Sequence, residues 1–510
     1  MHRITRFFEK SIFGLGVVIF GWIFLLNLFL GGIKYDCKNK CAIPNGLLLV
    51  IGFALIGLVI FLGKKYEMKI HKIVEKEERL IRILSVVLLI VEFSISLAIS
   101  FATGWDAREV SWQADLVSQG DVNLDNEYFS HYPNNLLITF FYSLVFRFAG
   151  LFGLQMAGSV FVVVIQCFLS VLTGHLLYKV SKKMFSGSKI PMLIWLVYSL
   201  WMGLLPWYMI TYSDPVGILF PVLILWMYQS MENGKAVGQK SVGIGIAAFI
   251  GYRIKPTTVI IYIALVIVLV LRLISDKERK TRAKQLVCLL LSFFVFAGIY
   301  QKIDIGACMG FELDKEQELT ITHFAMMGLS EKRNGIFDID EVEYSLSFSD
   351  KASRQEANCK KIKQRLQNYG VGGLVNHIAK KTLINYNDGT FAWGKEAEFF
   401  AEEVEKPEWI VSKVLKDVYY NDGTYRVAFN TIMQGFLLLI LLGCLLNGIT
   451  LFQKKQVSDT ELIVMLALIG LFLFVTMFEA RARYVYVYVP LYILMGMRGY
   501  DRGFCLLKNR

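Results

Sequence analysis

The sequence predicts an all-α protein that crosses a membrane many times. Of its 510 residues, 55% are hydrophobic and 19% are charged, whereas a soluble globular chain has about 25% charged residues. The apolar residues form long uninterrupted runs, and a run of about 18 or more can span a bilayer as a helix. This composition excludes a disordered chain, a coiled coil and an ordinary soluble enzyme.

The net charge of +12 does not indicate a nucleic-acid partner. Lys and Arg residues cluster in short loops between the apolar runs, which is the pattern of cytoplasmic loops in membrane proteins. Both ends of the chain, residues 1–10 and 500–510, are basic. We therefore expect a multi-pass protein of the cell membrane with its N- and C-termini in the cytoplasm.

The expected spans follow from the apolar runs and the basic loops. Residues 64–81 are rich in Lys and Glu and are expected to form an amphipathic helix on the cytoplasmic surface. The stretch 134–149 is short and contains Arg147, so we expect an interfacial or re-entrant segment. About 12 crossings remain: 11–32, 47–63, 82–103, 154–178, 190–211, 213–231, 241–253, 257–274, 286–302, 430–452, 461–478 and 484–499.

The crossings divide the chain into four parts. Two additional N-terminal spans and a cytoplasmic loop (1–81) precede a transmembrane core (82–303), an extracytoplasmic region (304–428) and the C-terminal spans (429–510). The extracytoplasmic region has amphipathic, helix-like stretches at about 350–369 and 396–418.

A short repeat occurs inside the extracytoplasmic region. Residues 386–391 read YNDGTF and residues 420–425 read YNDGTY. Asp-Gly favours tight turns because Gly tolerates positive φ. The repeat is either a pair of similar turns or a rim that contacts substrate through residues such as Asp388.

Four clusters of unusual residues fall on the extracytoplasmic side of this topology. A charge at mid-membrane costs roughly 2.5–3.5 kcal/mol on insertion scales, so charges in or beside spans normally have a partner or a function. The first cluster opens an acidic loop, residues 104–132, and contains Asp106 and Glu109. A carboxylate here can act as a general base, bind a cation or cap a helix.

The second cluster is the segment HYPNN, residues 131–135, which closes the acidic loop. Its side chains can exchange hydrogen bonds with sugar hydroxyls, although a proline at this place also indicates a helix start. The candidate residues for contacts with a sugar or an acceptor are His131, Tyr132, Asn134, Asn135 and Tyr212.

The third and fourth clusters are basic. Arg253 and Lys255 precede Pro256, which interrupts a helix, and Arg481 and Arg483 lie between the last two spans. Arginine forms bidentate hydrogen bonds to phosphate, so these residues suit an anion. The alternatives are a misplaced cytoplasmic loop for the third cluster and an interfacial Glu–Arg anchor for the fourth.

Asp214 is a further candidate, in the turn Tyr-Ser-Asp-Pro at residues 212–215. Its carboxylate can bind a divalent cation or hold a polar group. No other cofactor is indicated, and an extracytoplasmic enzyme that uses a lipid-linked donor needs no nucleotide-binding glycine loop.

Carboxylates and cations on one face suggest an anionic lipid as substrate. The lipid phosphate would lie on the basic residues, and the atom attached to it would face the acidic loop. Transfer of a sugar from a polyprenyl phosphate fits this arrangement. Asp106 would take the proton of an acceptor hydroxyl, and Arg481, Arg483 and Lys255 would stabilise the departing phosphate.

The same motifs resemble those of the GT-C superfamily of integral-membrane glycosyltransferases. The resemblance is to bacterial relatives of protein O-mannosyltransferases and aminoarabinose transferases, and it covers about residues 90–500 in order. It rests on GWDAREV, HYPNN, YSDP, IKPTT and EARARY, which begin at residues 104, 131, 212, 254 and 479. It implies a GT-C-like bundle, a catalytic base at Asp106, a second acid at Asp214 and basic residues that hold the lipid phosphate.

The chain also departs from that family pattern. The family often has a paired Asp-Glu, whereas Ala107 and Arg108 follow Asp106 here, which leaves open whether Glu109 replaces the Glu of that pair. This departure leaves a metal requirement open. The extra N-terminal spans mean that the shared core begins at the third span.

Three other functions remain open from the sequence. An O-antigen ligase or polymerase would be expected to use residues of the large outer region, such as His323 and Arg333, and would leave the acidic loop unexplained. A transporter or flippase for a lipid-linked saccharide would favour inverted repeats and charges at the midplane. A non-catalytic scaffold of the cell envelope would not need Asp106.

Overall fold

A computed structural model shows an all-α bundle. It describes residues 2–35, 40–66, 76–121, 123–154, 158–186, 188–231, 236–275, 278–403, 409–453 and 457–508. The middle of the amphipathic helix expected at 64–81 lies outside the described residues, because 67–75 are among those not described.

The first half of the chain forms the helices that carry the acidic loop and the first basic cluster. Its elements are α1 (His2–Leu30), α2 (Asn45–Lys65), α4 (Glu77–Ala98), β1 (Phe101–Ala102), α5 (Trp105–Gln119), α6 (Asn126–His131), η1 (Pro133–Asn135), α7 (Leu136–Gly150), α8 (Gly158–Met184), α9 (Ile190–Trp201), η3 (Pro206–Met209), α10 (Ser213–Gly217), α11 (Leu219–Gln229), α12 (Val237–Ile254) and η4 (Pro256–Thr258).

The second half begins with long apolar helices, continues through the polar region and ends with the C-terminal helices. Its elements are α13 (Val259–Ser275), α14 (Arg279–Lys302), α15 (Ile305–Met309), η5 (Lys315–Gln317), α16 (Ile321–Gly328), α17 (Ile339–Leu346), α18 (Lys351–Tyr386), β2 (Glu402–Glu403), α19 (Ile410–Tyr419), α20 (Arg426–Gln453), α21 (Asp459–Met477), α22 (Arg483–Tyr486) and α23 (Val489–Lys508).

Seven helices within the described residues are long and apolar enough to cross a membrane. They are Thr5–Leu30, Glu77–Ala98, Gly158–Met184, Pro256–Ile274, Arg279–Lys302, Arg426–Gln453 and Asp459–Met477. These helices confirm the predicted class, an all-α polytopic membrane protein.

Several other expected crossings are shorter or interrupted. The apolar part of α2 and the 12-residue helix α9 are shorter than the roughly 20 residues that span a bilayer. The expected span 213–231 is broken into α10 and α11. The expected interfacial segment 134–149 forms α7, which has 15 residues and packs along α5 and α8.

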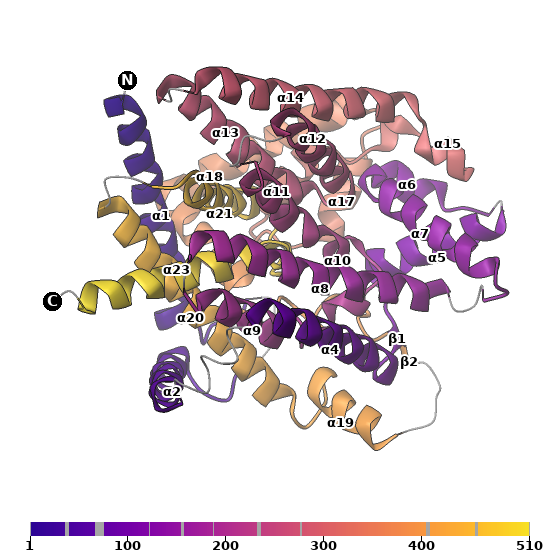
Figure 1. The fold of residues 1–510 in the computed structure, drawn as a ribbon. Coiled ribbons are helices and arrows are strands. Elements are labelled where there is room, and N and C mark those ends of the chain that lie inside the picture. The colour runs from indigo at the N-terminus through magenta and orange to yellow at the C-terminus, as the bar shows by residue number, and fades with distance from the viewer. Residues whose placement is uncertain are drawn as a thin grey trace.

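Ion pairs gather the helix ends that were predicted to be cytoplasmic. Lys182 near the end of α8 bonds Glu78 in the first turn of α4 at 3.0 Å. Asp459, at the start of α21, bonds Arg272 of α13 at 2.6 Å, and Arg272 also bonds Glu9 of α1 at 2.7 Å. Both chain termini lie on this side of the molecule, at the left of Figure 1. We call it the terminal end.

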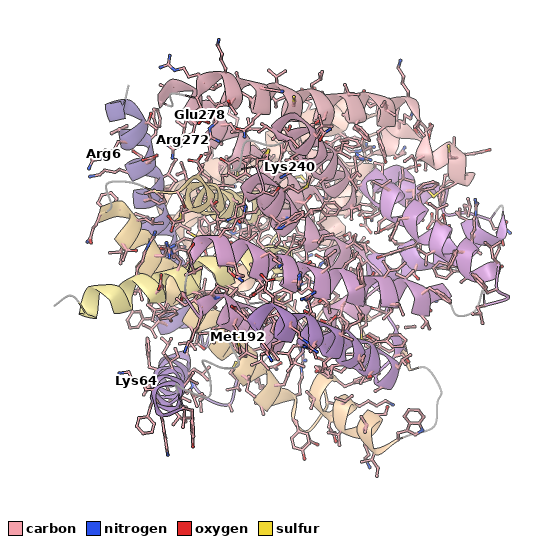
Figure 2. All side chains as sticks on the ribbon, viewed as in Figure 1. Arg6, Lys64, Met192, Lys240, Arg272 and Glu278 are labelled. Atoms are coloured by element: carbon pink, nitrogen blue, oxygen red, sulfur yellow. The ribbon has the colours of Figure 1, made fainter. Side chains whose placement is uncertain are left out.

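Three of the labelled residues in Figure 2 mark the same end. Arg6, Lys64 and Arg272 come from three different helices, and all lie toward the side of the termini. The helices α5, α6 and α7 lie at the opposite side of the molecule (Figure 1), which we call the site end. Helix ends that are far apart in the sequence therefore gather either at the terminal end or at the site end.

The polar region 304–428 packs into the helical bundle. Helix α18 kinks at Gly370, and its second half enters the core, where Lys381 to Trp393 are buried. Two indole N–H groups bond this segment, because Trp201 donates to the carbonyl of Gly389 at 2.9 Å and Trp207 donates to that of Thr390 at 3.1 Å. A Cβ at Gly389 would lie 2.1 Å from the carbonyl oxygen of Met433, so only glycine fits there.

The amphipathic pattern at 396–418 corresponds to a shorter helix than expected. The first part of α18 matches the expected helix at 350–369, but α19 begins only at Ile410. Residues 387–401 are instead turns and extended backbone that pack on the bundle. One short antiparallel pairing, β1 with β2, ties this segment to the end of α4.

A buried histidine lies under the first part of α18. His323 is fully buried, its Nδ1 lies 2.8 Å from Ser345 Oγ, and that hydroxyl bonds Asn358 at 3.1 Å. Burial lowers the pKa of His323 to about 4; the Glu341 carboxylate acts in the opposite direction, and Arg354 and Lys361 lower the pKa further.

The low pKa of His323 predicts a loss of stability in mild acid. Above the pKa of a free histidine, about 6.5, both states are neutral and there is no penalty. As the pH falls from 6.5 to 4, the unfolded chain binds a proton that the folded chain does not, so up to about 3 kcal/mol of stability is lost. Thermal unfolding between pH 7.5 and 4.5 should show a smaller acid loss for His323→Gln than for the wild type. Equal losses would contradict this assignment.

Candidate active site

The predicted charged residues converge where several helices end. Asp214 at the start of α10, Lys255 at the end of α12 and Arg483 at the start of α22 form one buried group. Lys255 Nζ lies 2.6 Å from Asp214 Oδ1, and Arg483 Nη1 donates to Asp214 Oδ2 at 3.3 Å. Their side chains are 1–8% exposed, so the opposite charges compensate one another in a dry environment.

Glu396 completes this group, and the sequence did not single it out. Arg481 donates to Glu396 Oε2 through Nε at 3.1 Å and Nη2 at 2.7 Å. Arg483 Nε lies 3.1 Å from the other carboxylate oxygen. We call Asp214, Lys255, Glu396, Arg481 and Arg483 the charge cluster. Nothing in the local pattern distinguishes Glu396 from the other acids of residues 304–428.

Asp106 adjoins the charge cluster through Tyr212. The Tyr212 hydroxyl donates to Asp106 Oδ2 at 3.2 Å and lies 3.4 Å from Asn135 Oδ1. Asn135 in turn donates to the Tyr128 hydroxyl at 2.7 Å. Asp106 is in the first turn of α5, where the helix dipole stabilises a negative charge, and it is half-buried. Two predicted motifs, GWDAREV and HYPNN, therefore meet at Tyr212.

Aromatic rings form the walls between Asp106 and the cations. The Arg483 guanidinium lies 4.7 Å from the Trp105 ring and 5.3 Å from the Tyr212 ring. Lys255 lies 5.1 Å from the ring of Tyr484, which also packs on Arg483. Cations over ring faces are stabilised without a full counter-charge. The walls thus keep the cations in place while leaving part of their charge available to an anion.

The backbone around this site is strained. Of the six non-glycine residues with positive φ in the described part of the chain, four lie in the two segments that carry Asp106 and Glu396: Trp105, Phe391, Ala392 and Glu398. Such conformations cost on the order of 1–3 kcal/mol each and cluster at functional sites. The strain is a second observation, independent of charge, that marks this place.

Two further predicted residues are Glu109, on α5, and Tyr132, in the HYPNN segment. Glu109 is one turn beyond Asp106, accepts from Gln113 at 2.8 Å and has its pKa raised by burial. Tyr132 directly precedes η1, and burial also raises its pKa. The predicted roles of both as substrate-facing groups remain predictions.

Three further residues stay close to the HYPNN backbone. The Nδ2 of Asn134 donates to Asn135 at 3.0 Å. His131 is half-buried, and burial lowers its pKa. Arg253 does not join the charge cluster in any contact of the described residues. Its guanidinium lies 4.4 Å from the Tyr300 ring and donates to the Tyr300 hydroxyl at 3.0 Å.

Asp388 holds its own turn. Its carboxylate accepts from the backbone N–H of Thr390 and Ala392, at 2.9 and 2.8 Å, and from the Thr390 hydroxyl at 2.7 Å. The residue is buried rather than on an exposed rim. This is the arrangement of a turn-forming aspartate.

Asp214 acts as a counter-ion in this structure. Both of its oxygens face cations, Lys255 and Arg483. Among the described residues, no group of three or more His, Cys, Asp or Glu side chains is arranged to hold a metal ion. The donor set at Asp214 therefore does not fit the divalent cation that the sequence left open.

The arrangement as a whole can bind an anion beside a carboxylate. Three cations, Lys255, Arg481 and Arg483, are paired with two acids, Asp214 and Glu396. A third acid, Glu479, accepts from the Tyr484 hydroxyl at 2.8 Å and interacts electrostatically with both arginines. Asp106 lies across Tyr212 from these cations. A group that carries a negative phosphate on one side and a hydroxyl on the other suits this pair.

Comparison with known proteins gives one match. A family model described as a conserved hypothetical integral membrane protein matches residues 4–503. No curated protein matches the chain, and no solved structure does.

Proposed function

The chain belongs to this family of conserved hypothetical integral membrane proteins, and we propose that it is a glycosyltransferase that uses a polyprenyl-phosphate sugar. The acceptor is an extracytoplasmic hydroxyl on a cell-wall polymer, a lipid or a protein. The observation that carries the proposal is the pairing of Asp106 with the charge cluster across Tyr212. The GT-C resemblance of the five motifs supports it.

The proposed membrane arrangement places the site end outside the cell. The bundle crosses the plasma membrane about 12 times, as in a GT-C-like core with two additional N-terminal spans. The terminal end, with Lys182 and Arg272 in its ion pairs, faces the cytoplasm, where basic residues of membrane proteins concentrate. The lipid phosphate reaches the charge cluster from the outer leaflet.

The proposed reaction is a displacement at the anomeric carbon. Asp106 removes the proton of the acceptor hydroxyl while its oxygen forms a bond to the anomeric carbon. The bond between that carbon and the phosphate oxygen breaks, and the electron pair leaves with the polyprenyl phosphate. Arg481, Arg483 and Lys255 stabilise the second negative charge that develops on the departing phosphate.

The sugar lies between the acid and the cations in this proposal. The Tyr212 hydroxyl donates to Asp106 and lies 3.4 Å from Asn135 Oδ1, so Tyr212 and Asn135 are placed to contact sugar hydroxyls. Glu109, one turn away on α5, is buried enough to be protonated more readily than a free glutamic acid. It can orient the acceptor but does not share the position of Asp106.

The ligase or polymerase alternative loses its main candidate residue. His323 is fully buried and bonded to Ser345, whereas such an enzyme would need it exposed to substrate. Arg333, the other candidate for this alternative, is exposed. No comparable observation favours a transporter. The basic residues of the terminal end, such as Arg272 and Arg502, pair with acids of neighbouring helix ends.

A comparison of cell envelopes tests the proposed function. Deleting the gene should remove one sugar from an envelope glycan or glycoprotein while its polyprenyl-linked precursor accumulates. Glycan composition and lipid-linked sugar analysis of the deletion strain, with and without the wild-type gene, identify donor and acceptor together. An unchanged glycan profile in the deletion strain would rule out the transferase.

A further inference from the structure

Glu396 occupies the position that an anionic substrate would take between the two arginines. Arg481 holds one of its oxygens with two N–H groups, at 3.1 and 2.7 Å, and Arg483 Nε lies 3.1 Å from the other oxygen. The three side chains are 7–10% exposed. Arginines bind phosphate in the same way, with guanidinium groups that converge on the oxygens of one anion.

The fit of the carboxylate is incomplete. Although Arg483 Nε and Glu396 Oε1 are 3.1 Å apart, neither atom has a well-directed hydrogen bond among the described residues. The remaining hydrogen bond of Arg483 in this group, to Asp214, is long at 3.3 Å. Glu396 therefore satisfies Arg481 but leaves Arg483 short of a well-aligned acceptor. A tetrahedral phosphate, with oxygens in more than one plane, can serve both.

The two acids of the charge cluster differ in how they are held. Asp214 is 1% exposed and contacts two cations from different helices, so it is part of the framework. Glu396 comes from the turn segment between α18 and β2, at the edge of the charge cluster. The segment is anchored by backbone bonds on both sides of Glu396, from Asn421 to the Gly394 carbonyl and from Gly104 to the Glu398 carbonyl. The side chain alone can turn away while the segment stays in place.

We propose that Glu396 is an internal counter-ion that occupies the phosphate subsite between Arg481 and Arg483, and that the phosphate of the donor displaces it. This inference rests on the proposed function and adds a residue that tunes affinity for the lipid. Without substrate, Glu396 compensates two buried arginines whose charges would otherwise be costly. With substrate, the phosphate takes over this compensation.

The exchange has a consequence for product release. The donor is a phosphodiester with one negative charge, and the departing polyprenyl phosphate is a monoester that carries up to two. Return of Glu396 opposes the extra attraction of the arginines for that product. The carboxylate therefore weakens binding of phosphate ligands and favours release of the spent lipid.

Binding of decaprenyl phosphate to the full chain in neutral-lipid nanodiscs tests the exchange. Glu396→Gln removes the competing charge and keeps the shape, so we expect binding about tenfold tighter than in the wild type. Its thermal midpoint without ligand should fall, and the stabilisation by decaprenyl phosphate should increase. Glu398→Gln is the matched control, since Glu398 is exposed in the same segment and, among the described residues, its hydrogen bond to Gly104 is made by the backbone carbonyl. It should leave both readouts unchanged.

The outcomes separate this inference from the proposed function. Equal or weaker binding by Glu396→Gln, with wild-type binding intact, would mean that the Glu396 contacts are only structural. No saturable binding by the wild type and by Glu396→Gln would remove the polyprenyl-phosphate donor and the inference with it. Inorganic phosphate as a second probe shows whether the lipid chain is required. If Glu396→Gln folds poorly, Glu396→Asp replaces it: the shorter side chain keeps the charge but fits the two arginines less well, so decaprenyl phosphate should bind more tightly than to the wild type.

Discussion

Asp106→Asn is expected to reduce sugar transfer about a hundredfold to ten-thousandfold, the usual contribution of a positioned general base. The reason is that Asp106 is the carboxylate that Tyr212 joins to the charge cluster. Asparagine has the same shape and still accepts the hydrogen bond from the Tyr212 hydroxyl. The variant should therefore fold and bind the lipid as the wild type does.

Purified protein in proteoliposomes gives the measurement for Asp106. Transfer from the donor found in the envelope comparison is followed by the release of polyprenyl phosphate. Asp115→Asn is the control, because Asp115 lies on the same helix, is half-buried, and has no part in the site. Equal rates for Asp106→Asn and wild type would exclude Asp106 from the mechanism. Loss of donor binding in Asp106→Asn would give the residue a binding role instead.

Asp214→Ala is expected to lower the free energy of unfolding by about 3–5 kcal/mol, the cost of leaving one half of a buried ion pair unpaired. Asp214 is the counter-ion of Lys255 at 2.6 Å and of Arg483 at 3.3 Å, and all three side chains are buried. Alanine would leave two cations without this acid in a dry place. The loss should exceed that of any single change among the exposed ion pairs.

Unfolding by denaturant in mild detergent measures the effect of Asp214→Ala. The double variant Asp214→Leu with Lys255→Met should lose less stability, because apolar side chains of similar volume often replace a buried pair at little cost. Lys332→Ala is the control for an exposed pair, since its partner Asp340 is also exposed. A loss below about 1 kcal/mol for Asp214→Ala would show that the charge cluster is compensated elsewhere.

The sequence predicted the parts of the molecule that depend on local composition. Apolar length identifies the long helices, and the alternation of basic loops assigns Asp106, Asp214, Lys255 and Arg483 to one face. Placement on one face is enough to suggest that they meet, and the structure brings Asp214, Lys255 and Arg483 into contact. That these residues bind a lipid phosphate remains a prediction.

The remaining parts depend on contacts between residues far apart in the chain. Asp388 reads as a surface turn, but its segment is buried because two tryptophans, Trp201 and Trp207, donate to its backbone. Arg253 stacks on Tyr300 of a helix that no local pattern pairs with it. Glu396 is placed by that buried segment, so no property of its own neighbours could reveal it.

The pairing of Glu9 with Arg272 and, through it, Asp459 has a consequence for biosynthesis. The partners of Glu9 are made 263 and about 450 residues after it. At about 5–20 residues per second, the first helix waits on the order of 20–90 s in the membrane before this link can close. During that interval its acidic residue and the side that later packs on α20 are without their final neighbours. The first helix therefore reaches its final packing only after most of the chain has been made.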